Sequence, residues 1–185
     1  MPTAAELIIL FNEIFRDQDT VLVGGGSEPL YEPATADGPA RLTFRADYPA
    51  SAQHEIAHWC IAGKRRRRLV DFGYWYEPDG RDAERQAVFE QVEARPQALE
   101  WAFHVAAGTI FHCSADNLDA GVADLAGFER AVVEAAGRYA RDGYPLRAQR
   151  WMTALADRFA GHGRLQAATW TLVEMGQARD PGSNP

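Results

Sequence analysis

The residues best suited to chemistry lie in the run His54-Glu55-Ile56-Ala57-His58. Two histidines four residues apart lie on one face of a helix, so both imidazoles can reach the same metal ion. This spacing occurs in zinc hydrolases, where the glutamate is the general base, and it can also supply the two histidines of a 2-His-1-carboxylate iron site. The run therefore predicts a metal site, with Glu55 as a candidate catalytic residue, and leaves the reaction open.

A third ligand has to come from elsewhere in the chain, because a catalytic metal normally has at least three protein ligands. The Gly and His that extend the motif in metzincins are missing, which excludes that class. The other candidates are His104, His112, His162, Asp71, Asp79, Asp82, Glu90 and Glu93. His104 has an apolar helical context typical of a core residue. Glu90 and Glu93 are three residues apart where a predicted helix ends, so both can face one site. Spacing alone does not choose among the candidates.

Composition predicts one globular domain. The 185 residues are 46% hydrophobic and 24% charged, which is ordinary for a soluble protein with a sizeable core. The sequence has no apolar stretch long enough to cross a bilayer and no signal-peptide pattern at Met1. Its two cysteines, Cys60 and Cys113, form no disulfide framework, and Cys60 is expected to be a packed thiol. These features predict a cytoplasmic protein without a membrane partner.

The net charge of -7 argues against general nucleic-acid binding. Five consecutive cations are a local exception directly after the motif helix: Lys64, Arg65, Arg66, Arg67 and Arg68. One interpretation is a solvated loop that also interacts with the C-terminus of the helix. The other is a docking site for an acidic macromolecule, placed close to the metal.

Several elements are needed to position the motif. Thr3-x-x-Glu6 is a capping box that starts an amphipathic first helix. In the motif helix, Ser51 is the predicted N-cap and Gly63 the predicted end. Further helices are predicted over 82–92, 97–107 with Pro96 in the first turn, 122–141, 145–159 and 165–176. Strands are predicted over 21–23, 41–45 and 69–76, with a turn at glycines 24–26 and a loop over 28–39.

This pattern predicts a helix-rich α+β fold with a small sheet beside the metal-binding helix. We expect one domain over residues 1–178 and a flexible tail over 179–185, because Asp180-Pro181-Gly182-Ser183-Asn184-Pro185 has the composition of a frayed end.

Long stretches of the chain resemble the elongation factor P hydroxylase family. The matching segments are 54–64, 69–76, 78–82, 89–101 and 116–118. The similarity is dense from Glu28 to Leu118 and weaker in the first helix and in the C-terminal helices. It includes runs of Trp, Tyr, Gly and Pro that rarely match by chance.

The resemblance implies hydroxylation of the β-lysylated lysine of elongation factor P by a non-haem iron(II) site, with dioxygen as co-substrate. The implied ligands are His54, His58 and Glu93, and Glu90 is the alternative to Glu93. A divalent ion other than iron can occupy such a site in a crystal. The implied partner is elongation factor P in its β-lysylated form. The implied fold is similar to that of a small metal-dependent ribonuclease of rRNA maturation.

Glu55 has a different role under each hypothesis. In a zinc-type peptidase or ribonuclease it activates water as the general base. In a hydroxylase it orients a ligand or a water, or meets the amino group of the substrate. Tyr74, Trp75 and Tyr76 are expected either to pack in the core or to wall the cavity, where they can contact an ammonium group. A third hypothesis is a metal-bound binding module without turnover.

Overall fold

A computed structural model of the chain describes residues 1–71, 83–114 and 125–177. For residues 83–91, 125, 173, 176 and 177 it describes the backbone only. The helices in these residues are α1 (Ala4–Ile14), α2 (Pro49–Ile61), α3 (Ala83–Ala107), α4 (Leu125–Asp142), α5 (Leu146–Phe159), α6 (His162–Ala167) and α7 (Leu172–Gln177). The strands are β1 (Thr20–Gly26), β2 (Leu30–Glu32) and β3 (Ala40–Arg45), and the 3-10 turns are η1 (Arg16–Gln18) and η2 (Arg66–Arg68). The predicted helix-rich α+β fold is confirmed. The predicted tail over 179–185 lies outside the described residues.

The first helix forms as the capping box predicts. The Thr3 hydroxyl accepts a hydrogen bond from the Glu6 N–H at 3.2 Å, and the Glu6 carboxylate accepts one from the Thr3 N–H at 2.9 Å. These bonds satisfy two N–H groups that a helix start leaves without partners. Leu7 and Phe11 on one face of α1 are fully buried, so the helix packs its apolar face into the core.

The sheet has the order β1-β3-β2, with β1 parallel and β2 antiparallel to β3. The predicted turn at the three glycines is wrong, because β1 continues through them with a register shift between Val23 and Gly26. A Cβ on Gly24 would lie 2.7 Å from the Asp47 carboxylate, and Gly25 has a φ of 81°. The glycines therefore permit close packing and a bulge within a strand.

Strand β2 lies in the segment that was predicted to be a loop. Three residues between two prolines have no periodic pattern, and β3 provides the hydrogen-bond partners on one side. On the other side Tyr31 exchanges backbone hydrogen bonds of 2.7 and 2.9 Å with Asp71. The predicted strand over 69–76 is thus reduced, within the described residues, to a single bridge at Asp71. Tyr74, Trp75 and Tyr76 lie outside them.

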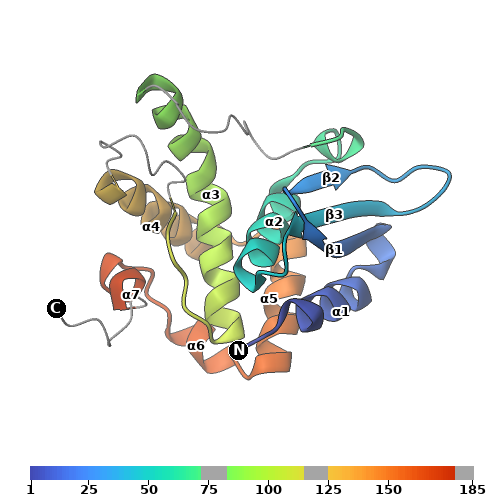
Figure 1. Cartoon of the computed structure of the whole chain (residues 1–185). Helices are drawn as coiled ribbons and strands as arrows, with labels where there is room; N and C mark the ends of the chain where they lie inside the picture. The colour runs from blue at the N-terminus through green and yellow to red at the C-terminus, as the bar shows by residue number, and fades with distance from the viewer. Residues whose placement is uncertain (72–82, 115–124, 178–185) are drawn as a thin grey trace.

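Helix α2 carries the histidine motif and packs between β3 and α3 (Figure 1). Its predicted cap at Ser51 is wrong: the helix starts with Pro49, and the Ser51 hydroxyl accepts a hydrogen bond from the Arg45 N–H at 3.1 Å. Proline suits this first position because its missing N–H has no partner there in any case. The helix ends at Ile61, two residues before the predicted stop at Gly63.

Helix α3 is the long central helix, and it runs through Pro96 without the predicted break. A proline inside a helix removes one backbone hydrogen bond and costs about 3 kcal/mol. Tertiary packing offsets this cost, since Ala98, Leu99 and Phe103 are fully buried after the proline. Local sequence signals therefore predicted two helices where burial stabilises one.

The C-terminal pattern over 165–176 was predicted to be one helix and is two short ones, α6 and α7. Trp170 lies between them with a φ of 56°, which a helix cannot accommodate. Its ring packs edge-to-face on Trp101 of α3 at 5.0 Å, and this contact accompanies the break. The helices predicted over 122–141 and 145–159 correspond to α4 and α5, while residues 122–124 lie outside the described part.

An aromatic cluster anchors α2 to the rest of the core. Trp59 lies 5.2 Å from Phe11 and 4.8 Å from Phe15, and Trp151 of α5 lies 5.8 Å from Phe11, all measured between ring centroids. Trp59 is 2% exposed and is therefore a core residue. Cys60 is also buried, and burial raises the pKa of its thiol, so the predicted packed thiol is confirmed. No helix in the described parts of the chain combines the length and the apolar character that a bilayer crossing needs.

Arg150 joins α5 to the turn after α1. Its guanidinium donates hydrogen bonds of 3.0 and 2.8 Å to the two carboxylate oxygens of Asp17, and these bonds lower the pKa of Asp17 to about 2. Because the folded-state pKa lies below the ordinary value of 3.8, this carboxylate stabilises the fold above pH 3.8, and the contribution disappears as the pH falls through 2.

We therefore expect Asp17→Asn to be less stable than the wild type at pH 7, with the difference shrinking between pH 4 and pH 2. Urea unfolding at a series of pH values measures it. A difference between the two proteins that does not depend on pH would contradict the assignment of the ion pair.

Candidate metal centre

Three side chains from two helices converge where α2 faces α3. His54 and His58 project from α2, and Glu93 projects from α3. The Nε2 atoms of the two histidines are 3.0 Å apart. The Glu93 Oε2 atom lies 3.6 Å from His54 Nε2 and 3.3 Å from His58 Nε2. Among the side chains that the structure describes, this is the one group of His, Cys, Asp or Glu close enough to hold an ion.

The donor set fits a divalent metal ion. Two donors that each lie about 2.1 Å from one ion are about 3.0 to 3.4 Å apart at octahedral or tetrahedral angles. Two of the three separations here, 3.0 and 3.3 Å, lie in this range, and the third, 3.6 Å, is slightly longer. Glu93 is 3% exposed, and its Oε2 atom is buried without a hydrogen-bond partner. An unpaired buried carboxylate oxygen is costly unless a cation neutralises it. Two imidazoles and one carboxylate are the donors that non-haem iron(II) and other divalent ions use.

Glu100 joins this group from behind His54, and the sequence reasoning missed it. Its Oε2 atom lies 2.8 Å from His54 Nδ1, the ring nitrogen on the far side from Glu93. The sequence did contain a signal. Glu93, Gln97, Glu100 and His104 repeat at helical spacing, and all four are buried in a helix that is otherwise largely apolar over this stretch.

The carboxylates give this site a negative potential. Burial works to raise the pKa of Glu93, but His58 and His54 outweigh it, so the pKa is lowered. Burial is likewise outweighed at Glu100, whose pKa His54 and His104 lower to about 2. For His54, burial works to lower the pKa, while Glu100, Glu55 and Glu93 raise it to about 10. The surroundings therefore favour positive charge at the point where the three ligand atoms meet.

The other candidate ligands lie elsewhere. His104 is a buried core residue, as expected, with its Nδ1 atom 2.6 Å from the Thr109 hydroxyl. His112 and His162 are exposed, and Asp71 forms an ion pair with Arg66. Asp79, Asp82 and the side chain of Glu90 lie outside the described part of the chain.

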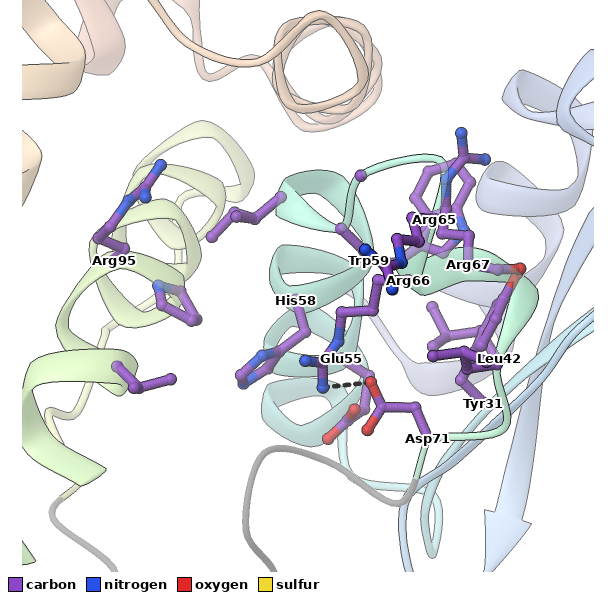
Figure 2. Close-up of a pocket in the computed structure, with 16 residues that line it drawn as sticks. Tyr31, Leu42, Glu55, His58, Trp59, Arg65, Arg66, Arg67, Asp71 and Arg95 are labelled. Carbon is purple, nitrogen blue, oxygen red and sulfur yellow. Dashed lines mark hydrogen bonds and ion pairs between the residues drawn. The ribbon is translucent and has the colours of Figure 1, made fainter. Parts of the chain in front are cut away.

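A cavity of about 580 Å³ reaches His58, one of the three predicted ligands (Figure 2). His58 and Glu55 of α2 both line it, so it extends to the predicted metal site. Its apolar walls include Leu42, Ile61 and Pro96. Arginines flank it from two segments: Arg65, Arg66 and Arg67 from the stretch after α2, and Arg95 from α3.

Glu55 lies in the cavity and outside the ligand group. It lines the cavity beside His58, and burial raises the pKa of its carboxyl, although the charges of His54 and His58 partly oppose that rise. The only other acidic side chain among the described lining residues is Asp71, which Arg66 already neutralises. Glu55 is therefore the carboxylate in the described lining that is available to a cationic ligand.

Arg147 of α5 holds the end of the metal helix in place. Its Nη2 atom donates to the carbonyl oxygens of Trp59, Cys60 and Ala62 at 2.8, 3.1 and 2.5 Å. These carbonyls lack partners at a helix C-terminus, and the cation also complements the negative end of the helix dipole. The guanidinium lies 4.6 Å from the centre of the Trp59 ring. Burial and the charge of Arg67 lower the pKa of Arg147.

Comparison with known proteins gives two consistent findings. Residues 10–170 match the profile of a family described as elongation factor P hydroxylase. The chain is also 49% identical over 170 residues to a Haemophilus influenzae protein named elongation factor P lysine hydroxylase, a match that covers 91% of this chain and 96% of the relative.

Proposed function

Because this chain belongs to the elongation factor P hydroxylase family, we propose that it is a metal-dependent lysine hydroxylase acting on the β-lysylated form of elongation factor P. The observation that carries the metal part of this proposal is the convergence of His54, His58 and Glu93. The buried Glu93 Oε2 atom has no hydrogen-bond partner and lies within 3.6 Å of both Nε2 atoms.

The proposed metal is iron(II), and the proposed co-substrate is dioxygen. An iron ion held by these three ligands would supply the oxidation of an unactivated C–H bond, which no side chain of the protein can perform. One oxygen atom enters the C–H bond of the lysine, and the other leaves as water with two electrons and two protons from an external reductant. His54, His58 and Glu93 bind the ion and leave coordination positions open.

The cavity walls have two tasks in this proposal. The apolar side chains of Leu42, Ile61 and Pro96 exclude water from the alkyl part of the substrate. Glu55 offers its carboxylate to an amino group of the β-lysyl-lysine and thereby orients the chain next to the ligands. Glu55 is thus proposed as a substrate-binding residue, although a hydrolase would use it as a base.

Mass spectrometry of β-lysylated elongation factor P tests the function. We expect a mass gain of one oxygen atom when the substrate is incubated with iron(II)-loaded protein, a reductant and air, and none without oxygen or with zinc(II) in place of iron. Lack of oxygen addition by iron-loaded protein would overturn the proposal. Zinc-dependent cleavage of a peptide or an RNA, abolished by Glu55→Gln, would support the hydrolase instead.

The arginines around the cavity are proposed to dock an acidic surface of the protein substrate. Arg65 and Arg68 are exposed in a chain whose net charge is -7, and Arg95 is exposed on the opposite side of the cavity. Cations grouped at the mouth of a cavity steer an anionic partner toward it. Lys64, Arg66 and Arg67 complete the predicted docking run, with Arg66 partly engaged by Asp71.

Charge reversal tests this docking role. We expect Arg65→Glu with Arg68→Glu to lower kcat/KM about 10-fold at low salt, mainly through KM, and the loss to shrink at high salt because screening weakens the wild-type attraction. Arg141→Glu is the control, since this exposed residue lies on α4, across α3 from α2 (Figure 1). An equal loss in the control variant would contradict local docking.

A further inference from the structure

We infer that Glu100 is a positioning residue for the metal site. It holds the His54 ring so that the Nε2 atom of His54 faces the ion. This inference rests on the proposed metal site and adds a residue outside the ligand group. It starts from the 2.8 Å contact between Glu100 Oε2 and His54 Nδ1. An ionised carboxylate oxygen can only accept a hydrogen bond, so the proton of the ring lies on Nδ1.

The consequence appears at the other ring nitrogen. With its proton on Nδ1, a neutral His54 ring has a lone pair on Nε2, the atom that lies 3.0 Å from His58 Nε2 and 3.6 Å from Glu93 Oε2. Glu100 therefore selects the tautomer that can bind a metal where the three ligand atoms meet. The hydrogen bond also fixes the ring orientation, as carboxylates behind metal-bound histidines do.

Glu100 is itself held in place. It is 7% exposed, and its second oxygen, Oε1, lies 3.6 Å from Nε2 of His104 one turn further along α3. The other ring nitrogen of His104 lies 2.6 Å from the Thr109 hydroxyl, just beyond the end of the helix. The contacts form a row from Thr109 through His104 and Glu100 to His54, so residues at the C-terminal end of α3 orient the ligand.

One residue on the same helix face provides a matched control. Gln97 is 3% exposed and lies between Glu93 and Glu100 along α3, but its side chain bonds to the backbone of Ser114 at 2.6 and 3.1 Å. It is as buried as Glu100, but its side-chain hydrogen bonds go to Ser114 and none goes to His54. Gln97→Met should disturb packing without changing the tautomer of the ligand.

Metal affinity is the first measurement, by competition of cobalt(II) with a chelating dye. We expect Glu100→Gln, which keeps the size of the side chain, to bind cobalt(II) about 10- to 100-fold more weakly than the wild type. Gln97→Met should stay within about 2-fold, because it removes no partner of a ligand. Unchanged affinity in Glu100→Gln would overturn the inference.

A second measurement separates positioning from charge. In the zinc(II)-loaded protein, nitrogen-15 NMR should show a protected, hydrogen-bonded Nδ1–H for His54, and this signal should shift or vanish in Glu100→Gln. The double variant Gln97→Glu, Glu100→Gln keeps one carboxylate on the same face of α3 but removes the carboxylate that contacts His54 Nδ1. Wild-type affinity in that double variant, or an unmoved Nδ1–H signal in Glu100→Gln, would contradict positioning. Neither measurement uses hydroxylation, so failure of the proposed function would be seen separately.

Discussion

Glu93→Ala is expected to reduce bound iron(II) from about one ion per chain to a trace and to reduce hydroxylation to background, because a three-ligand site then retains only two protein ligands. The native carboxylate oxygen lies within 3.6 Å of both histidine Nε2 atoms, and among the described side chains no other carboxylate completes the group. Iron content after gel filtration and the mass of the substrate measure the two effects.

Glu90→Ala is the control, since Glu90 lies on the same helix and is the other acidic candidate from the sequence. We expect it to retain far more iron than Glu93→Ala. Equal iron content in the two variants would contradict Glu93 as the third ligand. His54→Ala and His58→Ala should each lose iron and activity as Glu93→Ala does. The protein would instead be a binding module if the wild type shows no turnover and both histidine variants still form a complex with elongation factor P.

Arg147→Ala is expected to destabilise the protein by about 2–4 kcal/mol, a loss expected from the removal of charged hydrogen bonds and a cation–π contact. The substitution leaves the carbonyls of Trp59, Cys60 and Ala62 at the end of the metal helix without the guanidinium. Urea unfolding of the metal-free protein measures this loss. Iron affinity should fall as well, because His58 lies in the same last turn of α2.

Arg138→Ala provides the comparison for Arg147. Its guanidinium lies 3.7 Å from Glu134 within α4, and both side chains are more than half exposed, so removal should change the free energy of unfolding by less than about 0.5 kcal/mol. A loss in Arg147→Ala as small as that in Arg138→Ala would show that the helix end does not depend on Arg147.

Sequence signals predicted helices well where the capping residues and the apolar periodicity lie within one segment. The capping box started α1 at the expected place, and the apolar periodicity of 145–159 matched α5. Predictions failed where partners are distant in sequence. Strand β2 depends on β3 and Asp71, α3 passes through Pro96 because the following turns are buried, and the glycines of β1 serve close packing.

Prediction of the candidate metal site from residue spacing also reached only the features within one helix and not the contacts between distant residues. The spacing of His54 and His58 is a property of one helix, so the sequence itself indicated a shared metal. The resemblance to the family, confirmed by the comparisons, then implied Glu93 and the reaction. Residue spacing alone did not distinguish Glu93 from Glu90 as the third metal ligand, because no local signal indicates which side of α3 faces α2.

The sequence by itself determined the metal-binding helix, the helix-rich α+β class and the family, because these depend on residue types at fixed short spacings. Only the tertiary structure brought Glu93 to within 3.6 Å of both histidines, put Glu100 behind His54 and set Arg147 against the end of α2. These contacts join residues that are 35 to 88 positions apart in the chain, and such contacts form only when burial of the apolar faces packs α2, α3 and α5 together.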